Sequence, residues 1–200
     1  MTTTAIFGSL VLLMLLRVPI AVALGLSSVI GLMMSDISLE IVTQRMFSTN
    51  NSFPLLAIPF FILAGEIMST GGMSRRLVDF AYSLVGHLTG GLGAVAILGS
   101  SFFAALSGSN AATVAAIGGV MNKPMEEKGY RPQYTAATIA AAGVTGMIIP
   151  PSILLILYGV VTGVSIADLF LAGLFPGILI CISLLLLNRY LSNREAIERT

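Results

Sequence analysis

The chain has 200 residues, of which 56% are hydrophobic and 10% charged, with a mean hydropathy of +0.97 and a formal net charge of +1. Because a soluble domain carries about 25% charged residues, this composition excludes a single water-soluble domain and predicts an all-α polytopic membrane protein. The net charge says nothing about partners, and no basic patch suggests a nucleic-acid partner. Cys181 is the only cysteine, which excludes an intrachain disulfide.

Residues 5–34 are apolar except for the Arg-Val-Pro sequence at 17–19. One continuous helix would measure about 45 Å, against a hydrocarbon core of roughly 30 Å, so the segment is either one tilted helix or two short ones. No basic residue precedes it and no cleavage site closes it, so we expect a retained membrane segment and not a signal peptide. The polar residues 35–52 predict an external loop or an interfacial helix.

Residues 53–69 form the next predicted span, which Gly71 and Gly72 stop. Residues 73–87 alternate charge and apolarity at helical spacing, which predicts an amphipathic helix lying in the membrane interface. Glu66 is expected to be an interfacial cap or salt-bridge partner, and His87 an interfacial residue.

Two later apolar stretches are each interrupted in the middle. Residues 92–121 are interrupted by Ser-Gly-Ser-Asn at 107–110, and residues 135–161 by Gly146 and by Pro-Pro-Ser at 150–152. In a membrane, irregular backbone is tolerated only where protein buries it or where it lines a cavity. The pair therefore predicts a binding site at bilayer depth, as in secondary transporters. A charged loop at 122–133 and a plain span at 169–187 complete the predicted elements.

The distribution of basic residues predicts the orientation. Eight of the ten lysines and arginines fall around residues 75–76, 123–131 and 189–199, which the positive-inside rule places in the cytoplasm. Residues 92–121 must then enter and leave the membrane through one face, which predicts a re-entrant hairpin. Its arms, taken as 92–106 and 111–121, would measure about 22 and 16 Å and would end near the middle of the membrane.

The hairpin tip and the second interruption offer complementary groups. At the tip, carbonyls at the end of one arm attract cations, and amides at the start of the next attract anions. Pro150 and Pro151 lack an N–H, so carbonyls near Gly146 and Met147 lose their usual donors and can coordinate Na⁺.

Two structural alternatives stay open: a simple kink at 107–110 in a tilted helix, and a proline kink at 150–151 that binds no ion. A serine hydrolase using Ser107 or Ser109 would need a histidine nearby. His87 is the only histidine and is expected at the cytoplasmic interface, so we expect no enzymatic function.

Four segments resemble the large membrane subunit (M, or DctM-like) of tripartite ATP-independent periplasmic (TRAP) transporters. They are RVPIA at 17–21, PLLAIPFFILAGE at 54–66, FAALSGSNAATVA at 103–115 and GMIIPPS at 146–152. The resemblance implies the ion-transporter-superfamily fold, in which each of two inverted repeats has one re-entrant hairpin and one broken helix. It also implies an elevator-type, Na⁺-driven importer of organic acids, such as C4-dicarboxylates or sialic acid, in the bacterial inner membrane.

The same resemblance implies partners and site residues. The partners are a small membrane subunit (Q-type) and a periplasmic substrate-binding protein, and no organic cofactor is implied. A sodium site forms from the hairpin tip and the broken helix, which on this chain means Ser107, Ser109, Asn110, Gly146, Ile149 and Pro150. The substrate would meet Asn110, Thr113 and Ser152.

The chain resembles only the first repeat of that family, so a separate chain supplying the second repeat, or a truncated product, is expected. The implied organisation is scaffold helices at 1–70, an interfacial arm helix at 71–91, half of the transport domain at 92–168, and a last span with a cytoplasmic tail at 169–200. The alternative function is a non-transporting membrane scaffold or assembly subunit.

Overall fold

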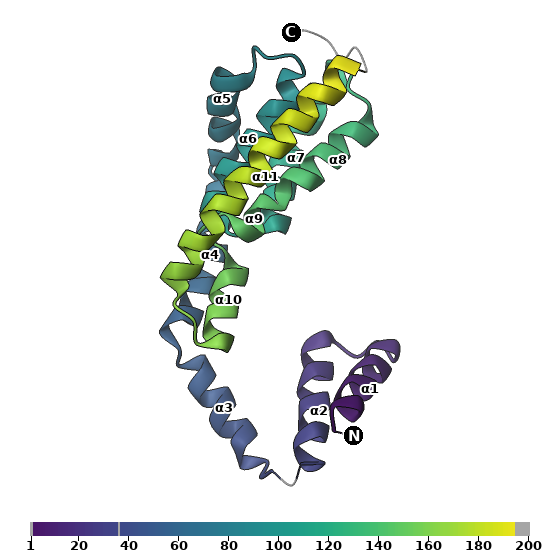
Figure 1. Ribbon diagram of the computed structural model, residues 1–200, viewed down its shortest axis with the longest axis vertical. Helices are drawn as coiled ribbons and strands as arrows, with labels where there is room; N and C mark the ends of the chain where they lie inside the picture. Colours follow the sequence, from purple (N-terminus) through teal and green to yellow (C-terminus); the bar gives the residue numbers. More distant parts are fainter. Residues whose placement is uncertain (1, 36, 195–200) are drawn as a thin grey trace. The chain divides into compact units, whose positions relative to one another are not determined.

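The computed structural model describes residues 2–35 and 37–194 and divides the chain into two units, Met1–Ser52 and Phe53–Thr200. Within the described residues all regular structure is helical, which confirms the all-α fold class (Figure 1). Three helical stretches are long and apolar enough to cross a membrane: Phe53–Thr70, Pro132–Thr162 and Ile166–Asn193.

Unit 1 contains α1 (Thr2–Leu15), α2 (Ile20–Met33) and α3 (Glu40–Asn50). The first apolar segment is therefore two short helices, and the chain reverses around Arg17, whose φ of 60° is uncommon outside glycine. Gly31 of α2 lies against Ile6 of α1, where a Cβ would come within 2.5 Å of the Ile6 side chain. The polar segment that follows contains the helix α3, so it is not simply a loop, and its position in the membrane interface stays a prediction.

Unit 2 contains the remaining helices: α4 (Phe53–Thr70), α5 (Met73–Val85), α6 (Gly91–Ser107), α7 (Asn110–Glu127), α8 (Pro132–Gly143), α9 (Thr145–Ile148), α10 (Ile153–Thr162) and α11 (Ile166–Arg194). Helices α6 and α7 form an antiparallel hairpin, and α8, α9 and α10 form a broken helix (Figure 1). Helix α11 runs back along α10, α9, α8 and α6. Entry of the hairpin into a bilayer through one face stays a prediction.

The second hairpin arm is longer than expected. Helix α7 continues through the residues predicted as a charged loop, so that prediction is wrong for 122–127. Lys123 and Glu127 form an i,i+4 ion pair of 3.8 Å on this extension, and Gly129, with a φ of 83°, follows its end. By helical rise the two arms measure about 25 and 27 Å. The apolar part of α7 still ends near Met121.

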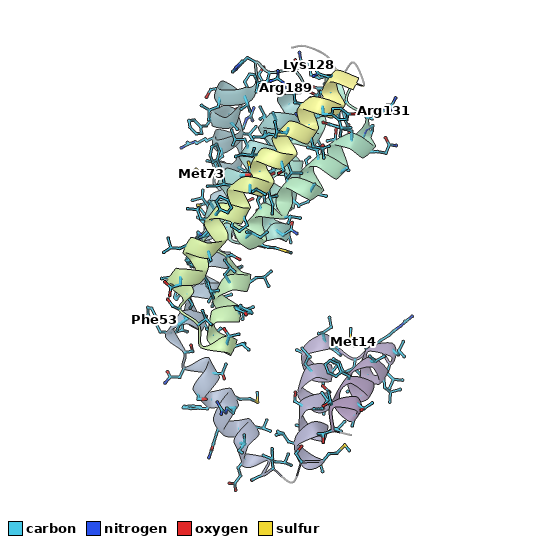
Figure 2. All side chains as sticks on the ribbon, viewed as in Figure 1. Met14, Phe53, Met73, Lys128, Arg131 and Arg189 are labelled. Carbon is cyan, nitrogen blue, oxygen red and sulfur yellow. The ribbon has the colours of Figure 1, made fainter. Side chains whose placement is uncertain are left out.

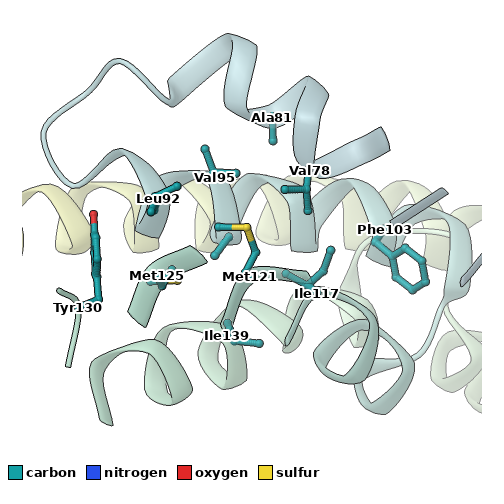
Figure 3. Close-up of a cluster of buried hydrophobic side chains, with 11 residues drawn as sticks. Val78, Ala81, Leu92, Val95, Phe103, Ile117, Met121, Met125, Tyr130 and Ile139 are labelled. Carbon is teal, nitrogen blue, oxygen red and sulfur yellow. The ribbon is translucent and has the colours of Figure 1, made fainter. Parts of the chain in front are cut away.

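A buried apolar cluster holds the hairpin together along its length (Figure 3). Leu92 and Met125 lie at its open end beside Tyr130, while Phe103 and Ile117 lie nearer the tip. Helix α5 lies antiparallel along α6 and buries Ser74, Val78 and Ala81. Burial, followed by the neighbouring Tyr134, raises the pKa of the Tyr130 phenol in the loop between α7 and α8.

Candidate functional site

The hairpin tip packs directly on the break in the broken helix. The Ile153 amide donates a hydrogen bond of 3.3 Å to the Gly108 carbonyl. Gly146 faces the peptide between Ser109 and Asn110, because a Cβ on Gly146 would lie 2.9 Å from the Ser109 carbonyl oxygen and 3.0 Å from the Asn110 nitrogen. The two segments that the sequence assigns to one site are therefore in contact.

Four helix ends meet at this contact. Helices α7 and α10 begin there, and each has a serine N-cap: the Ser109 hydroxyl accepts from the Ala112 amide, and the Ser152 hydroxyl from the Leu155 amide, both over 3.4 Å. Helices α6 and α9 end there. Since helix starts carry partial positive charge and helix ends partial negative charge, the site presents both signs within a small volume.

One of the two carbonyls freed by the prolines already has a donor. Pro150 and Pro151 offer no N–H to the carbonyls of Gly146 and Met147. The Ser152 hydroxyl instead donates to the Met147 carbonyl over 2.6 Å. The Met147 carbonyl therefore has a donor within the protein, and Na⁺ coordination by the carbonyls of Gly146 and Met147 stays a prediction.

Two hydroxyls are buried inside the tip. The Ser107 and Thr113 oxygens lie 3.1 Å apart, and the Thr113 hydroxyl also donates to the Ser109 carbonyl over 2.7 Å. These contacts stabilise the turn from within. Of the three residues predicted to meet substrate, Thr113 and Ser152 are fully buried and Asn110 is partly exposed.

The side chain of Ile149 is buried. It packs against α11, where a Cβ on Gly177 would lie 2.6 Å from Ile149 Cγ1. A role of Ile149 in the sodium site stays a prediction. Pro150, the next residue, lies within the break and is partly buried.

Glycines on three helices allow close packing at the site, and the sequence patterns did not assign Gly65 or Gly177 to it. Gly143 lies beneath Asn110, and Gly65 of α4 lies against the tip, where its Cβ would be 3.5 Å from Ser107 Cβ. Gly177 of α11 makes room for the break. The spacing of Gly173 and Gly177, a small-xxx-small pattern typical of close helix packing, is the signal that could have shown that the predicted span 169–187 packs closely on another element.

Replacing Ser152 by alanine should destabilise unit 2 by about 2 kcal/mol, since it removes an N-cap and leaves the Met147 carbonyl unpaired. Denaturant unfolding in mixed micelles measures the change. Ser183→Ala is the matched control, because Ser183 is exposed and its only described bond runs to the Leu179 carbonyl of its own helix. Equal losses for both variants would contradict the assigned role of Ser152.

No group of three or more His, Cys, Asp or Glu side chains in residues 2–35 and 37–194 is placed to hold a metal ion. His87 lies in the turn before α6, whereas Ser109 follows the other end of this 17-residue helix. By helical rise these ends are about 25 Å apart. The structure therefore gives Ser109 no histidine partner.

A hairpin and a broken helix that meet inside an apolar helical bundle define an all-α, polytopic membrane protein. The chain belongs to the DctM component family of the tripartite ATP-independent periplasmic transporters, whose family model matches residues 7–200. This is a family of transport proteins and not of enzymes.

Three relatives illustrate the match. The C4-dicarboxylate TRAP transporter large permease protein DctM of Vibrio cholerae is 44% identical over 181 residues, covering 90% of this chain and 40% of the relative. The isethionate TRAP transporter permease protein DctMQ of Oleidesulfovibrio alaskensis is 42% identical, covering 95% and 30%. The sialic acid TRAP transporter permease protein SiaT of Haemophilus influenzae is 37% identical, covering 94% and 31%. The chain thus spans less than half the length of these relatives.

Proposed function

We propose that this chain is the first half of the large permease subunit of a Na⁺-coupled, elevator-type transporter that imports small organic acids across the bacterial inner membrane. The relatives are named for C4-dicarboxylates, isethionate and sialic acid. All of these carry a carboxylate or sulfonate, which supports an anionic substrate. A periplasmic binding protein would deliver it, a small Q-type subunit would accompany the permease, and further chain would supply the second repeat.

The contact between the hairpin tip and the broken helix carries this proposal. Na⁺ would be held by oxygens of the predicted set, namely Ser107, Ser109, Asn110, Gly146, Ile149 and Pro150, mostly through backbone carbonyls. The starts of α7 and α10 would attract the acid group, with Asn110, Thr113 and Ser152 as predicted contacts. Lys128, Arg131 and Arg189 lie at one end of unit 2, and that end would face the cytoplasm (Figure 2).

Cysteine labelling in membrane vesicles tests the topology and the ion together, on a Cys181→Ala background. His87, Asn122 and Asp168 are exposed and suit topology reporters, and the exposed Ala111 beside the tip suits an ion reporter. We expect His87→Cys and Asn122→Cys to label from one side and Asp168→Cys from the other. Na⁺, but not choline, should slow labelling of Ala111→Cys several-fold.

The topology labelling and the Na⁺ protection of Ala111→Cys test separate parts of the proposal, and each has its own contradicting result. If His87→Cys and Asn122→Cys label from opposite sides, α6 and α7 are not re-entrant and the mechanism falls. If the topology holds but Na⁺ leaves Ala111→Cys unchanged, sodium coupling at this tip is wrong. Tip variants that assemble normally and still support transport would favour the scaffold alternative.

A further inference from the structure

The open end of the hairpin carries a buried polar contact that the candidate site does not use. Asn188 lies on the apolar helix α11 and is 4% exposed. Its side-chain oxygen accepts a hydrogen bond of 2.5 Å from the Tyr134 hydroxyl of α8. Its side-chain nitrogen donates over 3.1 Å to the carbonyl of Gly90, immediately before α6. We call Gly90, Gly93, Tyr134 and Asn188 the root lock.

Two glycines let the elements approach closely enough for this contact. A Cβ on Gly93 would overlap the Asn188 side-chain oxygen, and a Cβ on Gly90 would overlap the Ser192 hydroxyl. Gly90 also has a φ of 71°, which favours glycine. The Asn188 carboxamide therefore joins α11 to α8 and to the start of the hairpin. At this point the glycine backbone of the hairpin packs directly against side chains of α11.

Rigid elements connect the root lock to the tip. Helix α6 runs 17 residues from Gly91 to Ser107, and the buried cluster fixes α7 against it. Helix α8 carries Tyr134 in its first turn and ends at Gly143. Gly143 packs against Asn110 of the tip, because a Cβ on Gly143 would lie 2.6 Å from the Asn110 side-chain oxygen. Close-packed interiors transmit displacement, so a shift at the root moves both partners of the tip contact.

We propose that Asn188 is a positioning residue: by tying the hairpin root and α8 to α11, it keeps the hairpin tip in register with the break. The proposal concerns the fold and does not require that the chain transport anything. The Asn188 carboxamide satisfies one donor and one acceptor in an apolar setting, where unpaired groups are costly.

Hydrogen–deuterium exchange in lipid nanodiscs tests the proposal through a peptide covering residues 149–156. Its Ile153 amide bonds to Gly108 at the tip, far from Asn188. Asn188→Leu should speed exchange of this amide about tenfold, and Tyr134→Phe, which removes one hydroxyl, should speed it several-fold. Ser192→Ala is the matched control. It lies one turn further along α11 and removes a buried hydroxyl that has no hydrogen-bond partner within the described chain, so exchange should change less than twofold.

Two outcomes would overturn the proposal. In one, exchange rises in a root peptide covering 88–95 while the Ile153 amide is unchanged, which would make the contact merely local. In the other, amides at 157–162 beyond the break accelerate equally, which would indicate general destabilisation. If Asn188→Leu does not fold, Tyr134→Phe decides the question alone.

Discussion

Replacing Gly108 by alanine should destabilise unit 2 by about 3 kcal/mol and detach the tip from the break. Gly108 has a φ of 61°, and a Cβ there would lie 2.5 Å from the Pro151 carbonyl oxygen. The left-handed backbone strain and the steric clash add to each other. The clash cannot be relieved by a side-chain rotation, because the added Cβ meets a backbone carbonyl oxygen. Denaturant unfolding in mixed micelles measures the loss, and faster exchange of the Ile153 amide reports the separated tip.

Gly163→Ala separates the two causes. Gly163 ends α10 with a φ of 73°, and nothing lies within 4 Å of its Cβ position. Its substitution should cost only the left-handed strain, about 1 kcal/mol. If both variants lose equal stability, the Pro151 contact contributes nothing and the assigned tip geometry is wrong.

Gly146→Ala should produce the second large effect, a loss of about 2 kcal/mol together with loss of Na⁺ protection at the tip. Its Cβ would lie 2.9 Å from the Ser109 carbonyl carbon and oxygen, closer than real Cβ contacts, and both atoms are backbone. The tip must therefore move off the break and separate the two halves of the proposed sodium site. Unfolding and the Ala111→Cys labelling assay measure the two consequences.

Gly119→Ala is the control for Gly146→Ala. Gly119 is exposed on α7 and has nothing within 4 Å of its Cβ position. Alanine there should stabilise the helix by about 0.5–1 kcal/mol. If Gly146→Ala is as harmless as Gly119→Ala, the hairpin and the broken helix do not touch as described. If it destabilises but keeps Na⁺ protection, the ion lies elsewhere.

Much of the site could be predicted because its signals are local. Serine and glycine at 107–110 interrupt an apolar run, and Pro150 and Pro151 remove amide donors whatever the rest of the chain does. The end of α7 was misjudged for the opposite reason. Residues 122–127 look like loop by polarity and include Pro124, yet Lys123, Glu126 and Glu127 are good helix formers, and an i,i+4 pair supports the last turn.

The sequence by itself determined the membrane class, the two interruptions and the family, since hydropathy, proline and glycine act along the backbone. Only the tertiary structure decided that the first apolar segment is two helices and that the Met147 carbonyl is occupied by Ser152. The hydrogen bond between Tyr134 and Asn188, which are 54 residues apart, is likewise visible only in the tertiary structure. Contacts between distant residues depend on which helices pack against one another, and a local pattern can mark a packing face without naming the residue that it meets.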